Sequence, residues 1–207
     1  MRALCRDLAG RGWIAWNVEY RRLGRLSGGG WPTTFADVAC AIDHLDEIRT
    51  DALLDLSRVV AIGHSAGGHL AVWAAARPRL PQGAPGSRPR VRVTAAVAQA
   101  GVVDLRLAYQ LQLSKGVVGD LLGGGPDRFA ARYALASPAE LVPLGVPVLL
   151  THGGRDDIVP PPVTEAYATA ARAAGDEVEV VLLDDEDHFG HIDPCNPLWT
   201  AVVQWLA

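Results

Sequence analysis

The chain has 207 residues, of which 49% are hydrophobic, and its formal net charge is −4. This is the size of one domain, with enough apolar residues to bury a substantial core. The charges are scattered along the chain, which argues against a nucleic-acid partner and against an acidic membrane surface. Three widely spaced cysteines, Cys5, Cys40 and Cys195, fit a reducing compartment and neither a disulfide framework nor a zinc site.

The N-terminal stretch does not resemble a targeting segment. Charged residues, among them Arg2, Arg6 and Asp7, interrupt its apolar residues, whereas a signal peptide has a continuous apolar region. No apolar run in the chain approaches the length of a membrane span. We therefore expect a cytoplasmic protein that binds neither membranes nor nucleic acids.

The hydrophobic pattern predicts helices and strands in alternation. An amphipathic helix over residues 1–8 precedes a strand over 13–20, and a glycine-rich loop over 24–30 leads to a helix over 33–49. Further strands are predicted over 59–62, 93–99, 146–151 and 177–183, with helices over 70–76, 126–135, 161–174 and 197–206. This alternation predicts the α/β class, with a mostly parallel sheet and helices on both faces.

The alternation breaks between residues 102 and 137, where a helix through Leu113 is followed by an apolar segment, three glycines and another helix. We expect this segment to form a small helical cap over a pocket, as an insertion in a single domain that spans residues 1–207. Candidate substrate-binding residues are Trp31, Asp104, Leu105 and Tyr109.

Residues 59–68 join an apolar strand to the motif Gly63-x-Ser65-x-Gly67 and then to a helix. A serine hydroxyl is a poor nucleophile, so an enzyme that uses one exposes it on a sharp turn beside a base and N–H donors. The pattern predicts such a nucleophile elbow, with Ser65 at positive φ. We expect side chains at Gly63 and Gly67 to collide with the neighbouring strand and helix.

Acyl transfer by serine also needs a histidine base and an acid that orients it. Open parallel sheets place such groups on the loops that follow the strands. The loop after residue 151 offers Asp156 and Asp157, and the loop after residue 183 offers His188 and His191. The chain order serine, acid, histidine is the order of α/β-hydrolases.

Three stretches make the chain resemble the α/β-hydrolase superfamily: residues 63–68, His152-Gly-x-x-Asp156-x-x-Val159-Pro160, and Asp187-His188-Phe189. Within it, the chain is most similar to the small esterase and kynurenine-formamidase-like branch related to hormone-sensitive lipase and feruloyl esterases. The resemblance extends over essentially the whole chain. It implies that Ser65 is the nucleophile, Asp156 the acid and His188 the base.

The remaining acidic and histidine residues have simpler interpretations. His191 is expected at the surface or at a pocket rim, His64 beneath the elbow, and His152 as a brace for the acid loop. The acidic run over 184–187 is typical of a solvated loop rather than a metal site. We expect no metal ion and no cofactor.

The resemblance also implies an oxyanion hole with two donors, of which the elbow supplies one, the backbone N–H of Ala66. In the family, the other comes from a His-Gly-Gly loop after the third strand, and this sequence has none upstream of Trp13. We therefore expect Met1 to be an internal methionine of a longer protein, with the family's first three strands absent. The strand over 13–20 and the elbow strand would then either close up or leave backbone groups unpaired, and activity would be impaired.

The sequence predicts a cofactor-independent serine hydrolase that cleaves small carboxylic esters or amides through an acyl-enzyme. Two alternatives remain open. One is an arylformamidase, which would differ in its pocket residues. The other is a degenerate α/β-hydrolase that binds a ligand without catalysis, since the oxyanion loop is missing.

Overall fold

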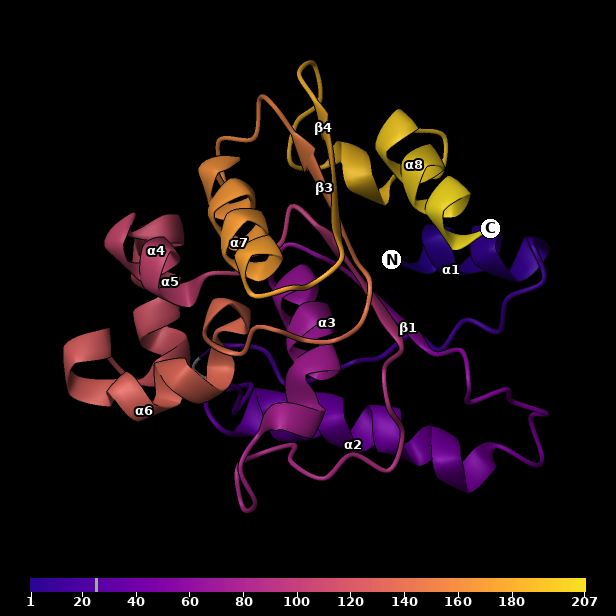
Figure 1. Cartoon of the computed structure of the whole chain (residues 1–207), viewed down its shortest axis with the longest axis horizontal. Coiled ribbons are helices and arrows are strands. Elements are labelled where there is room, and N and C mark those ends of the chain that lie inside the picture. The colour runs from indigo at the N-terminus through magenta and orange to yellow at the C-terminus, as the bar shows by residue number, and fades with distance from the viewer. Residues whose placement is uncertain (25) are drawn as a thin grey trace.

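The computed structural model describes residues 1–24 and 26–207, so Arg25, inside the glycine-rich loop predicted over 24–30, lies outside the described residues. A parallel sheet lies at the centre, and helices cover both of its faces (Figure 1). The elements are α1 (Arg2–Gly10), α2 (Thr33–Ile48), β1 (Val60–His64), α3 (Ala66–Ala76), η1 (Arg77–Arg79), β2 (Ala95–Gln99), α4 (Leu105–Gln110), α5 (Leu113–Leu122), α6 (Pro126–Ala136), η2 (Pro138–Glu140), β3 (Val148–Gly153), α7 (Pro162–Ala173), β4 (Val178–Leu183), η3 (Gly190–Ile192) and α8 (Pro197–Leu206).

The four strands pair in the order β1-β2-β3-β4, and every pair is parallel. All six residues of β3 are buried, as expected for an inner strand of a parallel sheet that is covered on both faces. The predicted α/β fold with a parallel sheet and helices on both faces is confirmed.

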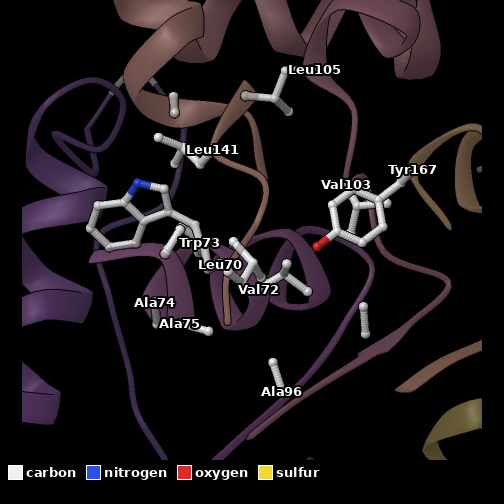
Figure 2. Packing of buried hydrophobic residues seen from close by; sticks show 14 of the residues in the cluster. Leu70, Val72, Trp73, Ala74, Ala75, Ala96, Val103, Leu105, Leu141 and Tyr167 are labelled. Atoms are coloured by element: carbon white, nitrogen blue, oxygen red, sulfur yellow. The ribbon is translucent and has the colours of Figure 1, made fainter. Parts of the chain in front are cut away.

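Alternate residues of the inner strands point into two separate cores. Ala96, Ala98, Val148 and Leu150 belong to the larger core, which also includes side chains of α2, α3 and α7. Figure 2 shows part of this core, where Leu70, Val72 and Trp73 of α3 contribute to the packing. Helix α3 is buried along nearly its whole length, which explains its alanine-rich sequence.

The smaller core lies on the opposite face of the sheet, beneath α1 and α8, which are neighbours in Figure 1. Val97 and Leu149 point into it and meet Leu4 of α1 and Trp199 of α8. The indole N–H of Trp199 donates a hydrogen bond of 2.8 Å to Asp7. The two ends of the chain are therefore packed together on one face.

The prediction of a strand over residues 13–20 is wrong, because the structure has an irregular segment there. Ile14 is 64% exposed and Trp16 is 47% exposed, while the guanidinium of Arg58 lies 4.4 Å from the ring centre of Trp13. An extended segment becomes a strand only when its backbone pairs with a neighbour. Among the described residues no strand lies along the outer edge of β1, so of the two expected outcomes the closing-up with the elbow strand does not occur.

Helices α4, α5 and α6 fall within the segment predicted as a cap and contact one another (Figure 1). The helix predicted through Leu113 ends earlier, at Gln110. Gln112, Ser114 and Lys115 have φ values of 52°, 47° and 63°, and this left-handed backbone interrupts a right-handed helix. None of the helices in the described ranges is long and apolar enough to cross a membrane.

Candidate active site

The turn between β1 and α3 has the conformation of a nucleophile elbow. Ser65 lies between the last residue of β1 and the first residue of α3, with φ of 56° and ψ of −120°. Its N–H donates to the carbonyl of Gln99 at 2.8 Å, and its carbonyl accepts from the N–H of His69 at 3.1 Å. The predicted strand–turn–helix context and positive φ of Ser65 are confirmed, and the side chain is half-buried.

The two glycines of the motif differ in how much space surrounds them. A Cβ on Gly63 would collide with the backbone carbonyl group of Gly67 and lie 2.8 Å from the nitrogen of Gly68. A Cβ on Gly67 would meet nothing within 4 Å, so the expectation that Gly67 is sterically required is wrong. Gly68, next to the motif, is also crowded, since a Cβ added there would lie 2.9 Å from the Cα of Gly101.

Asp156 lies on the turn after β3 and is held by three hydrogen bonds. Its Oδ1 accepts from the N–H groups of Ile158 (2.9 Å) and Val159 (2.8 Å), and its Oδ2 accepts from Nδ1 of His188 (2.6 Å). Burial acts to raise the pKa of Asp156, but the bond from His188 and the two amide bonds outweigh it, so the pKa is lowered. The carboxylate is therefore ionised at neutral pH, whereas Asp157 is exposed.

His188 is 4% exposed and comes from the loop that follows β4. Because Nδ1 binds a carboxylate, the proton of the neutral ring is assigned to Nδ1, and Nε2 is left as an acceptor. In the part of the chain that the structure describes, no hydrogen bond joins the hydroxyl of Ser65 to this ring. The ring of His64, the residue before Ser65, has its centre 4.5 Å from that of the His188 ring.

His152, at the end of β3, braces the acid loop as predicted. Its Nε2 donates to the carbonyl of Val159 at 2.7 Å, and its Nδ1 accepts from the hydroxyl of Thr164 at 2.7 Å. Nε2 also lies 3.3 Å from Oδ2 of Asp156. Burial lowers the pKa of His152, so a neutral ring supports the carboxylate.

His191 is fully buried, so its expected place at the surface or at a pocket rim is wrong. Its Nδ1 lies 3.1 Å from the hydroxyl oxygen of Thr151, and its carbonyl accepts from the side-chain amide of Gln99 at 2.9 Å. Burial lowers the pKa of His191 to about 3. Gln99 and Thr151 are not among the residues predicted for the site, although each is a polar residue at the end of an apolar strand, and that signal could have found them.

The candidate substrate-binding residues lie in different surroundings. Asp104 caps α4 by accepting from two backbone N–H groups, and Leu105 is 1% exposed in the larger core. Trp31 packs edge-on against Phe35, with ring centres 5.0 Å apart. Tyr109 lines an open pocket of about 450 Å³, together with residues 112, 116, 119, 120 and 123–125. Substrate binding by these four residues stays a prediction.

The oxyanion donor proposed at the elbow is available. Ala66 is the first residue of α3, so its N–H has no acceptor within the helix. The described residues contain no group of three or more histidine, cysteine or acidic side chains arranged to hold a metal ion.

A parallel sheet between two helical layers, with a serine elbow after one strand and an acid and a histidine after later strands, defines an α/β-hydrolase fold. The chain belongs to the BD-FAE family, whose model matches residues 1–170. The esterase LipQ of Mycobacterium tuberculosis is 31% identical over 172 residues, which cover 79% of this chain and 39% of LipQ. The chain thus spans well under half the length of this relative.

Solved structures of similar fold include two hydrolases. Esterase 2 of Thermogutta terrifontis, phosphoramylated by tabun, matches with a TM-score of 0.74 and 23% identity over 99% of this chain and 73% of that one. The acetyl ester-xyloside bifunctional hydrolase of Caldicellulosiruptor lactoaceticus matches with a TM-score of 0.68 and 23% identity over 86% of this chain and 66% of that one. These likenesses establish the fold.

Proposed function

We propose that this chain carries the nucleophile, acid and base of a serine hydrolase that cleaves small carboxylic esters. The observation that carries the proposal is the 2.6 Å bond between Asp156 and Nδ1 of His188. The positive φ of Ser65, on the turn after β1, is consistent with a nucleophile elbow. Membership of the BD-FAE family and the similarity to an esterase support it.

In the first half of the proposed reaction, the hydroxyl oxygen of Ser65 attacks the ester carbonyl carbon and its proton passes to Nε2 of His188. The ionised Asp156 stabilises the imidazolium through Nδ1–H. The negative charge that develops on the carbonyl oxygen accepts a hydrogen bond from the N–H of Ala66. The bond to the alcohol then breaks, and the alcohol leaves with the proton from His188.

The second half of the reaction returns the enzyme to its starting state. Water attacks the acyl group on Ser65 while His188 takes one of its protons. The bond between Ser65 and the acyl carbon breaks, the serine oxygen regains a proton from His188, and the carboxylic acid is released. No cofactor is required for either half.

The proposal is tested by labelling the folded protein with a fluorophosphonate probe, which reacts with activated serines. We expect mass spectrometry to find the adduct on Ser65 and to find none in Ser65→Ala. Ser57, exposed in the loop before β1, provides the control, because Ser57→Ala should label normally. Absence of labelling in a protein that unfolds cooperatively would contradict the proposal.

The substrate class is tested with p-nitrophenyl esters of increasing acyl length and with an N-formyl arylamine. We expect turnover of short esters that is lost in Ser65→Ala. Preference for the formamide would instead favour the arylformamidase alternative. Binding of these compounds without turnover would favour the non-catalytic alternative.

A further inference from the structure

Three polar side chains lie next to one another at the carboxyl end of the sheet. The register pairs His64 of β1 with Gln99 of β2, and Gln99 with Thr151 of β3. Residues that are paired in register point to the same face of a sheet. We call His64, Gln99 and Thr151 the polar row.

Every member of the polar row contacts the base loop, which we define as residues 184–191. Nε2 of His64 donates to the backbone carbonyl of His188 at 2.7 Å. The amide of Gln99 donates to the backbone carbonyl of His191 at 2.9 Å, and the hydroxyl of Thr151 lies 3.1 Å from Nδ1 of His191. Gln99, Thr151 and His191 are fully buried, so these contacts are shielded from water.

The base loop needs such anchors because of where it starts. It leaves β4 at one edge of the sheet, whereas Ser65 follows β1 at the other edge. Neighbouring strands lie about 4.8 Å apart, so the three steps from β4 to β1 span about 14 Å. The polar row supplies an anchor on each of the three strands that the loop crosses.

We propose that the polar row, and His64 above all, positions His188 so that its imidazole keeps the bond to Asp156 and faces Ser65. This inference rests on the proposed function, since it assigns positioning residues to that reaction. The 2.7 Å bond fixes the backbone of the base itself, and the ring of His64 packs against the ring that it positions. Burial lowers the pKa of His64, so at neutral pH the ring is neutral and donates from Nε2.

Two substitutions separate the hydrogen bond of His64 from its bulk. His64→Phe keeps a ring but removes the donor, and we expect kcat to fall about tenfold, the scale of one lost hydrogen bond, with KM changed less than about twofold. His64→Gln keeps an N–H near the position of Nε2 and should retain kcat within about threefold. The control is His44→Phe, which makes the same substitution at an exposed histidine of α2.

A role for His64 in packing alone predicts a different result. Both His64 variants would then melt at a lower temperature, but the folded protein would keep its kcat in each. Gln99→Leu tests the row at a second position, and we expect it too to lower kcat with little change in KM.

A second measurement does not depend on turnover. The proton on Nδ1 of His188, bound to Asp156, should give a low-field NMR signal that is absent in Asp156→Asn. We expect this signal in the unaltered protein and in His64→Gln, and a shifted or broadened signal in His64→Phe. An unchanged signal in His64→Phe would overturn the inference. If Ser65 resists the fluorophosphonate, the proposed function fails, and the NMR comparison still decides whether His64 positions His188.

Discussion

The backbone of Ser65 is strained, since a residue with a side chain rarely adopts φ of 56° with ψ of −120°. Such a conformation costs on the order of 1–3 kcal/mol and persists only where the surroundings impose it. Here the bonds to Gln99 and His69 fix the peptide groups on both sides of the serine. We expect this turn to present the hydroxyl to a substrate, as a nucleophile elbow does.

The contrast between Gly63 and Gly67 gives a prediction about stability. Gly63→Ala places a methyl group against the backbone of Gly67 and Gly68, which cannot move without breaking the elbow. We expect it to lower the melting temperature severely or to prevent folding. Gly67→Ala adds a methyl group in open space and should be neutral, or stabilising by up to about 1 kcal/mol through helix propensity. Equal loss of stability in the two variants, measured by thermal unfolding, would contradict this steric explanation.

Asp156 and Asp157 form a matched pair for testing the acid. Asp156→Asn keeps an oxygen for the amides of Ile158 and Val159 but presents an NH₂ group to Nδ1–H of His188. We expect kcat to fall on the order of 10³–10⁴-fold, because the ring is then held in the wrong tautomer. Asp157→Asn alters an exposed carboxylate and should leave kcat within about twofold. Steady-state ester hydrolysis checks both, and comparable losses would reassign the acid.

Between elements, the most buried arginine–carboxylate pair of the described residues joins α2 to the end of α3. The guanidinium of Arg77, 1% exposed, donates to Asp43 at 2.6 and 3.2 Å, and the same carboxylate accepts from the N–H groups of Arg90 and Val91. Nε of Arg77 donates to the carbonyl of Gly86 at 2.7 Å. Asp43 therefore ties together two helices and the loop that leads to β2.

This arrangement predicts that Asp43→Asn destabilises the protein by about 3 kcal/mol or more, because it leaves the Arg77 charge buried without its partner. Asp46→Asn, on the same helix, removes an exposed pair with Arg49 and should cost less than about 1 kcal/mol. Urea unfolding at neutral pH measures both. A loss for Asp43→Asn no larger than that for Asp46→Asn would show that the pair contributes little.

The elements with strong local signals could be predicted from the sequence. Helix α8 begins at Pro197 after the capping residue Asn196 and ends at Leu206, as its pattern predicts. The segment over 13–20 is rich in apolar and aromatic residues like a strand, but pairing depends on a distant neighbour that no local pattern contains. The left-handed residues at 112, 114 and 115 are ordinary polar residues, so nothing in their identity marks the end of α4.

In the site, too, local motifs could be predicted from the sequence, whereas contacts between distant segments could not. Motif spacing selects Asp156 and His188, and the structure brings the two side chains together, whereas their catalytic roles stay predictions. The contacts of Gln99 and Thr151 depend on strand register, which the sequence does not specify for parallel strands joined by long connections. His191 was misplaced because a histidine in a polar loop gives no sign of burial.

At the scale of the whole molecule, buried histidines make stability depend on pH. Burial lowers the pKa of His69 to about 4, and the ring donates to the carbonyl of Ala136 at 2.9 Å. Between about pH 6.5 and about pH 4 the unfolded chain binds a proton at this residue and the folded protein does not. Stability is therefore lost as pH falls from about 6.5 to about 4, and His191 adds a loss that continues to about pH 3.

His69→Gln tests this dependence, because it keeps a donor for the carbonyl of Ala136 but cannot be protonated. The change in unfolding free energy between pH 7 and pH 4 should shrink by about 3 kcal/mol relative to the unaltered protein. Urea unfolding at both pH values measures the difference, with the exposed His44→Gln as the control. An unchanged pH dependence would show that His69 is not kept neutral by burial.

The strands pair in the order in which they occur in the chain, so during synthesis each strand meets a partner that has already emerged. The proposed nucleophile follows the first strand, the acid follows the third, and the base follows the fourth. A growing chain could thus form its elbow long before the residue that activates it exists. A chain that has emerged only as far as β3 would carry a serine without its proposed base, and that serine would be inert.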